Sequence, residues 1–223
     1  MADTTPISNA MNIALAIKLG DPAATGADNG VTASTDATDF SAAQRNQALS
    51  FAYNELANRL IKIYGKDAGK VCEGLVATQA ITFSASGVAL NKDYVATLTL
   101  LKSDNSEFGY TSLKALKQDL DPYLDAGYTI ENALIYAYQR TAGTLTILSS
   151  GTGTLYYIKS DRKSTTTAAD VAVNTSPDTT IDVTWHNFLI DYGAYWLCLN
   201  KASGEFIEKA PIYLAQADAR LPK

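Results

Sequence analysis

The sequence has few of the residues that most catalytic and metal sites require. Among its 223 residues it contains one histidine, His186, and two cysteines, Cys72 and Cys198. A histidine-based zinc site, or a Ser-His or Cys-His nucleophile pair, would therefore depend on this one imidazole. The cysteines lie far apart and form no CxxC pair, which argues against a disulfide framework and favours two small buried side chains in a reducing compartment. We expect no enzymatic activity, no metal and no cofactor.

Clusters of positive charge and long apolar runs are also missing. The 18 Lys and Arg residues are scattered, and 23 Asp and Glu residues give a net charge of -5, which argues against a surface that neutralises phosphates. No run approaches the roughly 20 apolar residues that span a bilayer. The segment from Met11 to Leu19 resembles the core of a secretion signal, but no basic residues precede it. Its spacing favours a short helix that Gly20 ends.

The clearest positive feature is a long amphipathic helix between Phe40 and Gly65. Ser41 and Gln44 have the spacing of a capping box, Phe40 is placed to pack against the first turn, and Gly65 ends the pattern as a left-handed cap. Alanines keep much of the helix surface small. A helix this regular, with no chemistry on it, suggests packing against copies of the same chain. Its apolar face carries Leu49, Tyr53, Leu56 and Leu60.

The composition divides the chain into helical ends and a strand-rich middle, which predicts an α+β fold. Residues 1–74 and 181–223 are predicted to form a helical bundle. Residues 75–163 are predicted to be an inserted antiparallel β-rich region with one short helix, from Ser112 to Leu124. Residues 164–180, rich in Thr, Ala and Asp, are predicted to be a mobile loop.

Turn and cap residues predict how the elements are joined. Strand-like runs begin near Ile81, Tyr94, Ala133, Gly143 and Thr154, and the glycines before the last run predict a hairpin. Two helices then close the chain. Thr184 is placed to cap the first, whose apolar face carries Trp185, Tyr192 and Trp196. The second is predicted from Glu205 to Leu221, starting or kinking at Pro211.

Two groups of carboxylates and the many tyrosines are weaker signals. Paired acids hydrolyse glycosidic bonds only at a fixed separation across a cleft. The acids Asp119, Asp121 and Asp125 are better explained by a helix end and turn, and Glu205 and Glu208 by the charge preference of a first helical turn. Thirteen tyrosines suit both sheet packing and wet protein interfaces.

Several phrases of the sequence occur in a characteristic order. The opening helix ends in Leu19-Gly20-Asp21, and the long helix has the form Phe-Ser-x-x-Gln…Glu-Leu-Ala-x-Arg-Leu, from Phe40 to Leu60. A strand begins with Leu-Asn-Lys-Asp-Tyr-Val at Leu90, a hairpin-like segment runs from Thr144 to Ile158, and a late helix begins Val-Thr-Trp-His-Asn-Phe-Leu at Val183. In this layout the chain resembles the head-to-tail adaptor proteins of tailed bacteriophages, also called connector, neck or head-completion proteins.

The resemblance implies a structural role in the virion. Its members form a ring of about twelve identical subunits beneath the portal protein, offer a platform to the tail or to a second neck protein, and let genomic DNA pass through the channel without sequence-specific binding. Such a subunit is assembled in the cytoplasm of the host bacterium and has no membrane partner. The predicted packing residues, within the core or between subunits, are Leu49, Tyr53, Leu56, Leu60, Trp185, Tyr192 and Trp196.

Two other functions stay open at this point. One is a virion protein of another layer, such as a tail terminator, a hub or a capsid-associated protein. The other is a hydrolase or carbohydrate-binding tail module that uses Asp119–Asp125 and the tyrosines.

Overall fold

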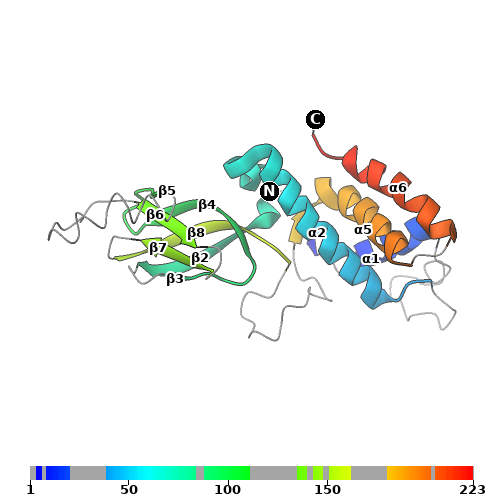
Figure 1. Cartoon of the computed structure of the whole chain (residues 1–223), viewed down its shortest axis with the longest axis horizontal. Helices are drawn as coiled ribbons and strands as arrows, with labels where there is room; N and C mark the ends of the chain where they lie inside the picture. Colours follow the sequence, from blue (N-terminus) through cyan, green and yellow to red (C-terminus); the bar gives the residue numbers. More distant parts are fainter. Residues whose placement is uncertain are drawn as a thin grey trace. The chain divides into compact units, whose positions relative to one another are not determined.

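The chain folds into two compact units, shown in Figure 1. The computed structural model describes residues 4–6, 9–20, 39–83, 88–110, 135–139, 143–147, 151–161, 180–201 and 204–222. Unit 1 comprises Met1–Leu75 and Ser160–Lys223, and unit 2 comprises Val76–Lys159. Because helices and largely antiparallel sheets occur together, the protein is α+β, as the sequence predicts.

Unit 1 is mainly helical. A short antiparallel sheet joins its two chain segments: β1 (Thr4–Pro6) pairs with β9 (Thr180–Asp182). Its helices are α1 (Asn9–Leu19), α2 (Ala42–Tyr64), α3 (Ala68–Val71), α5 (His186–Lys201) and α6 (Gly204–Asp218), with 3-10 turns η2 (Gly65–Asp67), η3 (Glu73–Leu75) and η4 (Val183–Trp185).

The capping box predicted for the start of the long helix is present, and α2 ends at Gly65 as predicted, but not with the left-handed cap. The Ser41 hydroxyl accepts a hydrogen bond from the Gln44 backbone N–H at 3.2 Å, and the Gln44 side chain accepts one from the Ser41 N–H at 2.8 Å. At the other end the Gly65 N–H donates to the Ile61 carbonyl. Gly65 has a φ of 57°, which favours glycine, although its ψ of -123° lies outside the left-handed helical region. Local sequence therefore sets both ends of this helix.

The core of unit 1 forms where α5 packs against α1, α2 and α6. The apolar face of α2 is fully buried there, and so are alanines on either side of that face. Small side chains let neighbouring helices approach closely, so these buried alanines of α2 serve packing within the chain itself. The buried alanines are Ala48, Ala52 and Ala57.

Gly193 on α5 marks a close approach between helices. A Cβ atom at this position would lie 3.3 Å from a methyl group of Leu15 on α1 and 3.7 Å from a methyl group of Leu49 on α2. The hydrogen atom of glycine leaves room for both leucines, which are completely buried. Gly193 is therefore a packing residue that joins three helices.

The two C-terminal helices differ in detail from the prediction. The cap before α5 is Asp182, whose carboxylate accepts a hydrogen bond from the Thr184 N–H at 2.8 Å. Thr184 was expected to be the cap, but it lies inside the 3-10 turn η4 that the Asp182 side chain caps. Helix α6 begins at Gly204 and runs through Pro211, so it does not start at the proline.

Unit 2 consists of two sheets. The first has the order β2-β8-β4 and is antiparallel, and the second has the order β3-β7-β6-β5 with a parallel pair between β5 and β6. A core of six buried side chains comprises Ile81, Leu100, Phe108, Leu145, Leu155 and Tyr157. The strands are β2 (Val76–Phe83), β3 (Val88–Ala89), β4 (Tyr94–Lys102), β5 (Gly109–Tyr110), β6 (Ile135–Gln139), β7 (Thr144–Ile147) and β8 (Gly151–Lys159).

The predicted hairpin between β7 and β8 is wrong. Strand β7 pairs with β3 and β6, whereas β8 lies between β2 and β4 in the other sheet. The nine residues of β8 reach from Gly151, paired with Phe83, to the far end of β2, and they also pair with β4. Long-range pairing on both edges of β8 therefore replaced the local turn that its glycines suggested.

Three further predictions lie wholly or mostly outside the described residues. These are the helix from Ser112 to Leu124, a turn that Ser86-Gly87 favours between the strand-like runs at Ile81 and Tyr94, and the mobile loop over 164–180, of which only Thr180 is described, as the first residue of β9.

Substituting Gly193 tests the close packing of α5. We expect Gly193→Val to lower the free energy of unfolding by about 1–3 kcal/mol, because the added methyl groups overpack against Leu15 and Leu49. Urea unfolding followed by helical circular dichroism measures the change. Gly204→Val is the matched control, since no atom lies within 4 Å of a Cβ there. Equal losses in the two variants would contradict the packing role.

Candidate functional site

Several charged side chains of unit 1 lie where its helices meet, and Asp191 is the most buried charged residue among those that the structure describes in this unit. Its carboxylate on α5 has 2% relative exposure. It accepts a hydrogen bond from Lys18 of α1 at 2.5 Å and lies 3.3 Å from Nε of Arg220, just beyond α6. Lys18 also donates to the Gln216 side chain at 2.8 Å. These contacts form one polar junction between α1, α5 and α6.

Arg59 forms a second junction, between α2, α5 and α6. Its Nε donates to Glu55 at 2.7 Å, and its Nη1 donates to Asp218 of α6. The guanidinium also lies over the rings of Phe188 and Tyr192, 5.9 and 5.6 Å from their centroids. Partial burial lowers the pKa of Arg59, but the hydrogen bonds with the two carboxylates outweigh it and the pKa is raised. The cation therefore stays charged at this junction.

Lys201 forms a third junction at the end of α5. Its ammonium lies between two aromatic rings, 4.9 Å from the centroid of Phe40 and 4.6 Å from that of Phe206. It donates to the carboxylate of Asp39 and, at 3.2 Å, to the Asp39 carbonyl oxygen. The two rings meet edge to face, with centroids 5.4 Å apart. The junction ties the start of α2 to the end of α5 and the start of α6.

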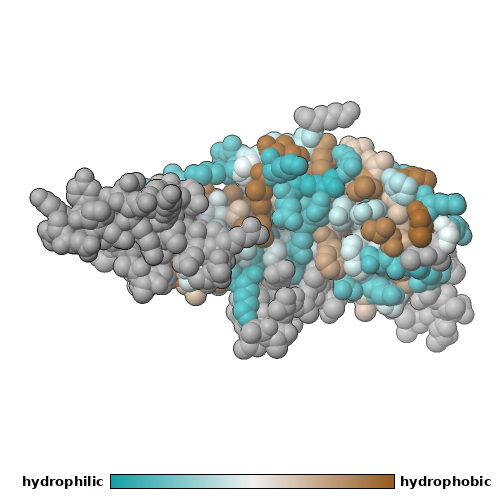
Figure 2. All heavy atoms as spheres, in the orientation of Figure 1, coloured by the Kyte–Doolittle hydropathy of each residue, from teal (hydrophilic) through white to brown (hydrophobic). Residues whose placement is uncertain are grey.

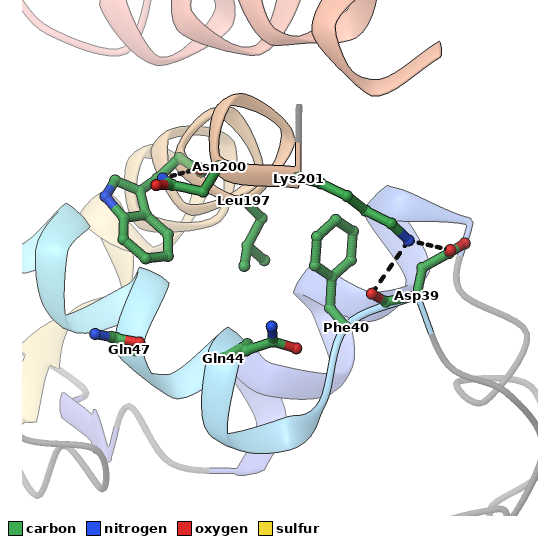
Figure 3. Close-up of a pocket in the computed structure, with 8 residues that line it drawn as sticks. Asp39, Phe40, Gln44, Gln47, Leu197, Asn200 and Lys201 are labelled. Atoms are coloured by element: carbon green, nitrogen blue, oxygen red, sulfur yellow. Dashed lines mark hydrogen bonds and ion pairs between the residues drawn. The ribbon is translucent and has the colours of Figure 1, made fainter. Parts of the chain in front are cut away.

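A pocket of about 240 Å³ lies beside this third junction, between the start of α2 and the end of α5 (Figure 3). Its polar groups already stabilise the helix ends: Gln44 belongs to the capping box, and the Asn200 amide donates to the Trp196 carbonyl at 2.7 Å. The Asp39 carboxylate is paired with Lys201. These lining groups hold structure together, and they do not converge as an acid and a base on one point of the pocket.

Buried polar contacts also hold the chain where it returns from unit 2. The Asp161 N–H donates to the Asn54 side chain at 2.7 Å, and the Ser50 hydroxyl donates to the Asp161 carboxylate. Ser50 and Asp161 are buried. Helix α2 thus fixes the start of the segment that leads to the C-terminal helices.

The seven residues predicted for packing divide into two groups. Five are buried, and Tyr192 and Trp196 are half-buried on α5. Tyr192 stacks on Phe188 with centroids 5.8 Å apart, and Trp196 stacks on Phe51 at 4.8 Å. The buried five are Leu49, Tyr53, Leu56, Leu60 and Trp185.

The burial of α2 changes the role expected for its apolar face. Leu56 has 0% exposure within the single subunit, so its side chain meets its own core and cannot also contact a neighbouring subunit. Leu56→Asp would bury a carboxylate and destabilise the fold, and its effect on assembly would not report on a contact between subunits. Any contact between copies would have to use other surfaces.

The surroundings of the single histidine and of the two cysteines indicate structural roles for all three. His186 Nε2 is 3.4 Å from the Ile181 carbonyl oxygen, next to the start of α5. Both cysteines are buried and free of disulfides. Burial raises the pKa of Cys72 to about 12 and that of Cys198 to about 11, so both thiols are protonated near neutral pH.

The carboxylates named as candidate acids are only partly described. Asp119, Asp121 and Asp125 lie outside the described residues. In the first turn of α6 Glu205 pairs with Lys209, and Glu208 is exposed. No group of three or more His, Cys, Asp or Glu side chains that could hold a metal ion occurs within the part of the chain that the structure describes.

Sequence reasoning missed the polar junctions and several exposed apolar residues. Asp191, Lys18 and Arg220 are far apart in the sequence, and no local pattern links them. The exposed face of α6 did carry a signal, because Ile207, Pro211 and Ala215 recur every four residues and are all exposed. Among the described residues, the large apolar side chains that remain exposed are Ile17, Ile63, Val183, Leu199, Ile207 and Ile212.

Comparison with models of known protein families and with curated proteins gives no match for this chain. In the described ranges, each helix is too short or too polar to span a lipid bilayer.

Lys18→Met tests the polar junction around Asp191. We expect it to lower the free energy of unfolding by about 3 kcal/mol, because it leaves a buried carboxylate with the more distant Arg220 as its remaining cation. The double variant Lys18→Met/Asp191→Leu should recover part of the loss, since it removes the buried charge as well. Lys70→Met, at an exposed ion pair with Asp67, is the control and should behave like the wild type. A double variant no more stable than Lys18→Met would contradict this explanation.

Thiol labelling tests the burial of the cysteines. At pH 8 the folded protein should not react with Ellman's reagent, because both thiols are buried and have a raised pKa; two thiols should react in urea. Since the thiols ionise at lower pH in the unfolded chain, stability should fall as the pH rises from about 8.5 towards the folded values. An introduced cysteine at the exposed position Ala43 should react at once. Equally fast labelling of the native thiols would refute the burial.

Proposed function

We propose that the chain is a structural subunit that assembles with copies of itself, as a head-to-tail adaptor of a tailed bacteriophage. In this proposal the helices of unit 1 form a helical bundle and unit 2 is its β-rich insertion. About twelve copies form a ring in the neck of the virion. The ring docks under the portal protein, receives the tail or a second neck protein, and encloses the channel for genomic DNA.

The observation that carries this proposal is the set of large apolar side chains on the outside of unit 1. Ile17 on α1 is 62% exposed, and Ile212 on α6 is 55% exposed. On α6, Ile207, Pro211 and Ala215 form an exposed stripe with a period of four residues. Figure 2 shows apolar surface over α6 beside polar groups. Single exposed isoleucines are ordinary, but a helix with an apolar outer stripe supports contact with another protein.

The polar groups of unit 1 support a structural role in a second way. Asp191, Arg59 and Lys201 all pair with charged groups or aromatic rings at junctions between helices. A subunit that carries load between a capsid and a tail needs helices in one fixed arrangement, and satisfied polar junctions favour this. The net charge of -5 is also compatible with a channel that repels DNA and lets it slide.

The experiment that tests this function is co-expression with the portal protein encoded by the same genome, followed by electron microscopy. We expect a ring of the chain on the tail-facing side of the portal, with an open channel, and no such ring with portal alone. A chain that does not associate with the portal would refute the adaptor role. Immunogold labelling of purified virions provides a second readout: label at the tail end or over the capsid, instead of at the neck, would assign the chain to another layer of the particle.

A further inference from the structure

Unit 1 carries two small surface patches of similar composition and opposite charge. The first, the acidic face, comprises Glu205, Glu208 and Ile212 on the outer side of α6. All three are exposed, and their spacing of three and four residues places them on one side of the helix. Ile212 is 55% exposed. Lys209 pairs with Glu205, so the excess negative charge of this face rests on Glu208, beside the exposed isoleucine.

The second patch, the basic end, lies at the C-terminal end of α2. It comprises Lys62, Ile63 and Lys66, all exposed, with Ile63 at 46%. Lys70 is close by in sequence and pairs with Asp67 at 2.6 Å, so the excess positive charge of this end rests on Lys62 and Lys66. The basic end is thus an exposed isoleucine flanked by two ammonium groups, the counterpart of the acidic face.

The two patches cannot meet within one subunit. The start of α6 lies against the start of α2, because the rings of Phe206 and Phe40 pack together with their centroids 5.4 Å apart. From there α2 runs for 23 residues, or about 34 Å at 1.5 Å per residue, before it reaches Ile63. Figure 1 shows the end of α2 and the first turns of α6 at opposite ends of unit 1. Any pairing of the two patches must therefore join different molecules.

We propose that the basic end of one subunit docks on the acidic face of the next copy of this chain. This inference rests on the proposed assembly of the subunit and names the surfaces that make its contact. Because two different patches meet, the contact is head-to-tail. In a pair of subunits, one therefore keeps a free acidic face and the other a free basic end. Repetition of such a contact closes into a ring when the rotation per subunit divides a full turn.

Charge complementarity is the reason to expect a second copy of this chain, and not another partner, at each patch. Each patch buries an exposed isoleucine against the other, while Lys62 and Lys66 face the Glu208 carboxylate and the Glu205–Lys209 ion pair beside it. Two acidic faces, or two basic ends, would place like charges together, which disfavours a symmetric dimer through the same surfaces. The contact should weaken at high salt, since its charged groups lie at the surface.

Site-specific cross-linking tests the contact on the full chain. Lys66→Cys and Glu208→Cys are purified separately, mixed, and treated with a short bismaleimide. The native Cys72 and Cys198 are buried and should stay silent. We expect a covalent dimer in the mixture and little in either variant alone, and a ladder of oligomers from the double variant Lys66→Cys/Glu208→Cys. Ala43→Cys, at the opposite end of α2, replaces Lys66→Cys in the control mixture and should give no dimer above background.

Two results would overturn the inference. One is cross-linking of a single variant with itself as strong as in the mixture, and the other is a mixture that reacts no more than the Ala43→Cys control. If rings still form on the portal in that case, the adaptor role survives and uses other surfaces. If the cross-link forms but no ring is found on the portal, the contact stands and the adaptor role fails.

Charge reversal gives an independent measurement. We expect Lys66→Glu and Glu208→Lys each to weaken self-association by roughly tenfold or more, because each places like charges together. The double variant Lys66→Glu/Glu208→Lys should restore association towards the wild-type level, as seen by sedimentation velocity. Failure of the double variant to recover, with both single variants folded by circular dichroism, would contradict the direct pairing of the two residues.

Discussion

The close packing of α5 against α1 and α2 is the constraint on which the rest of unit 1 depends. At Gly193 the missing side chain leaves room for Leu15 and Leu49, whose methyl groups lie within 4 Å of where a Cβ would stand. Protein interiors are packed nearly as densely as organic crystals, so this contact fixes the distance between the helices. Because Asp191 is two residues from Gly193, the same packing decides which groups its carboxylate can reach.

The polar junctions follow from that arrangement. A carboxylate as buried as Asp191 is costly unless cations reach it, and Lys18 and Arg220 come from segments at opposite ends of the sequence. Arg59 and Lys201 stabilise the other junctions in another way, since each combines ion pairs with contacts to two aromatic rings. Such contacts depend on direction, so they favour one register of the helices over others that would bury similar apolar area.

The sequence predicted the features that local chemistry determines. The capping box at Ser41 and Gln44 and the glycine at Gly65 lie within a few residues of the backbone groups that they satisfy, and α2 has these ends. The partners of β8 could not be predicted, because they are chosen by pairing with β2 and β4 across long stretches of sequence. For the same reason the meeting of Lys18 with Asp191 leaves no local pattern.

The role of α2 shows a different limit of sequence reasoning. An apolar stripe indicates that a helix face is buried, but it does not identify what buries it. The stripe through Leu56 and its neighbouring alanines packs inside the chain's own core, so the exposed residues of α2 lie off this face and toward its two ends. At the C-terminal end Ile63 is exposed, and so are Lys62 and Lys66.

The net negative charge of the chain gives these lysines a second effect in the proposed assembly, on the repulsion between copies. Copies of a chain with a charge of -5 repel one another, and the repulsion would grow in the ring that we propose. A head-to-tail contact that places Lys62 and Lys66 against the carboxylates of the next copy lowers this repulsion where the subunits touch. The acidic groups elsewhere on the subunit are then free to face solvent or a channel. An acidic subunit can assemble with itself in this way without becoming neutral, provided that its exposed positive charge is kept at the contact.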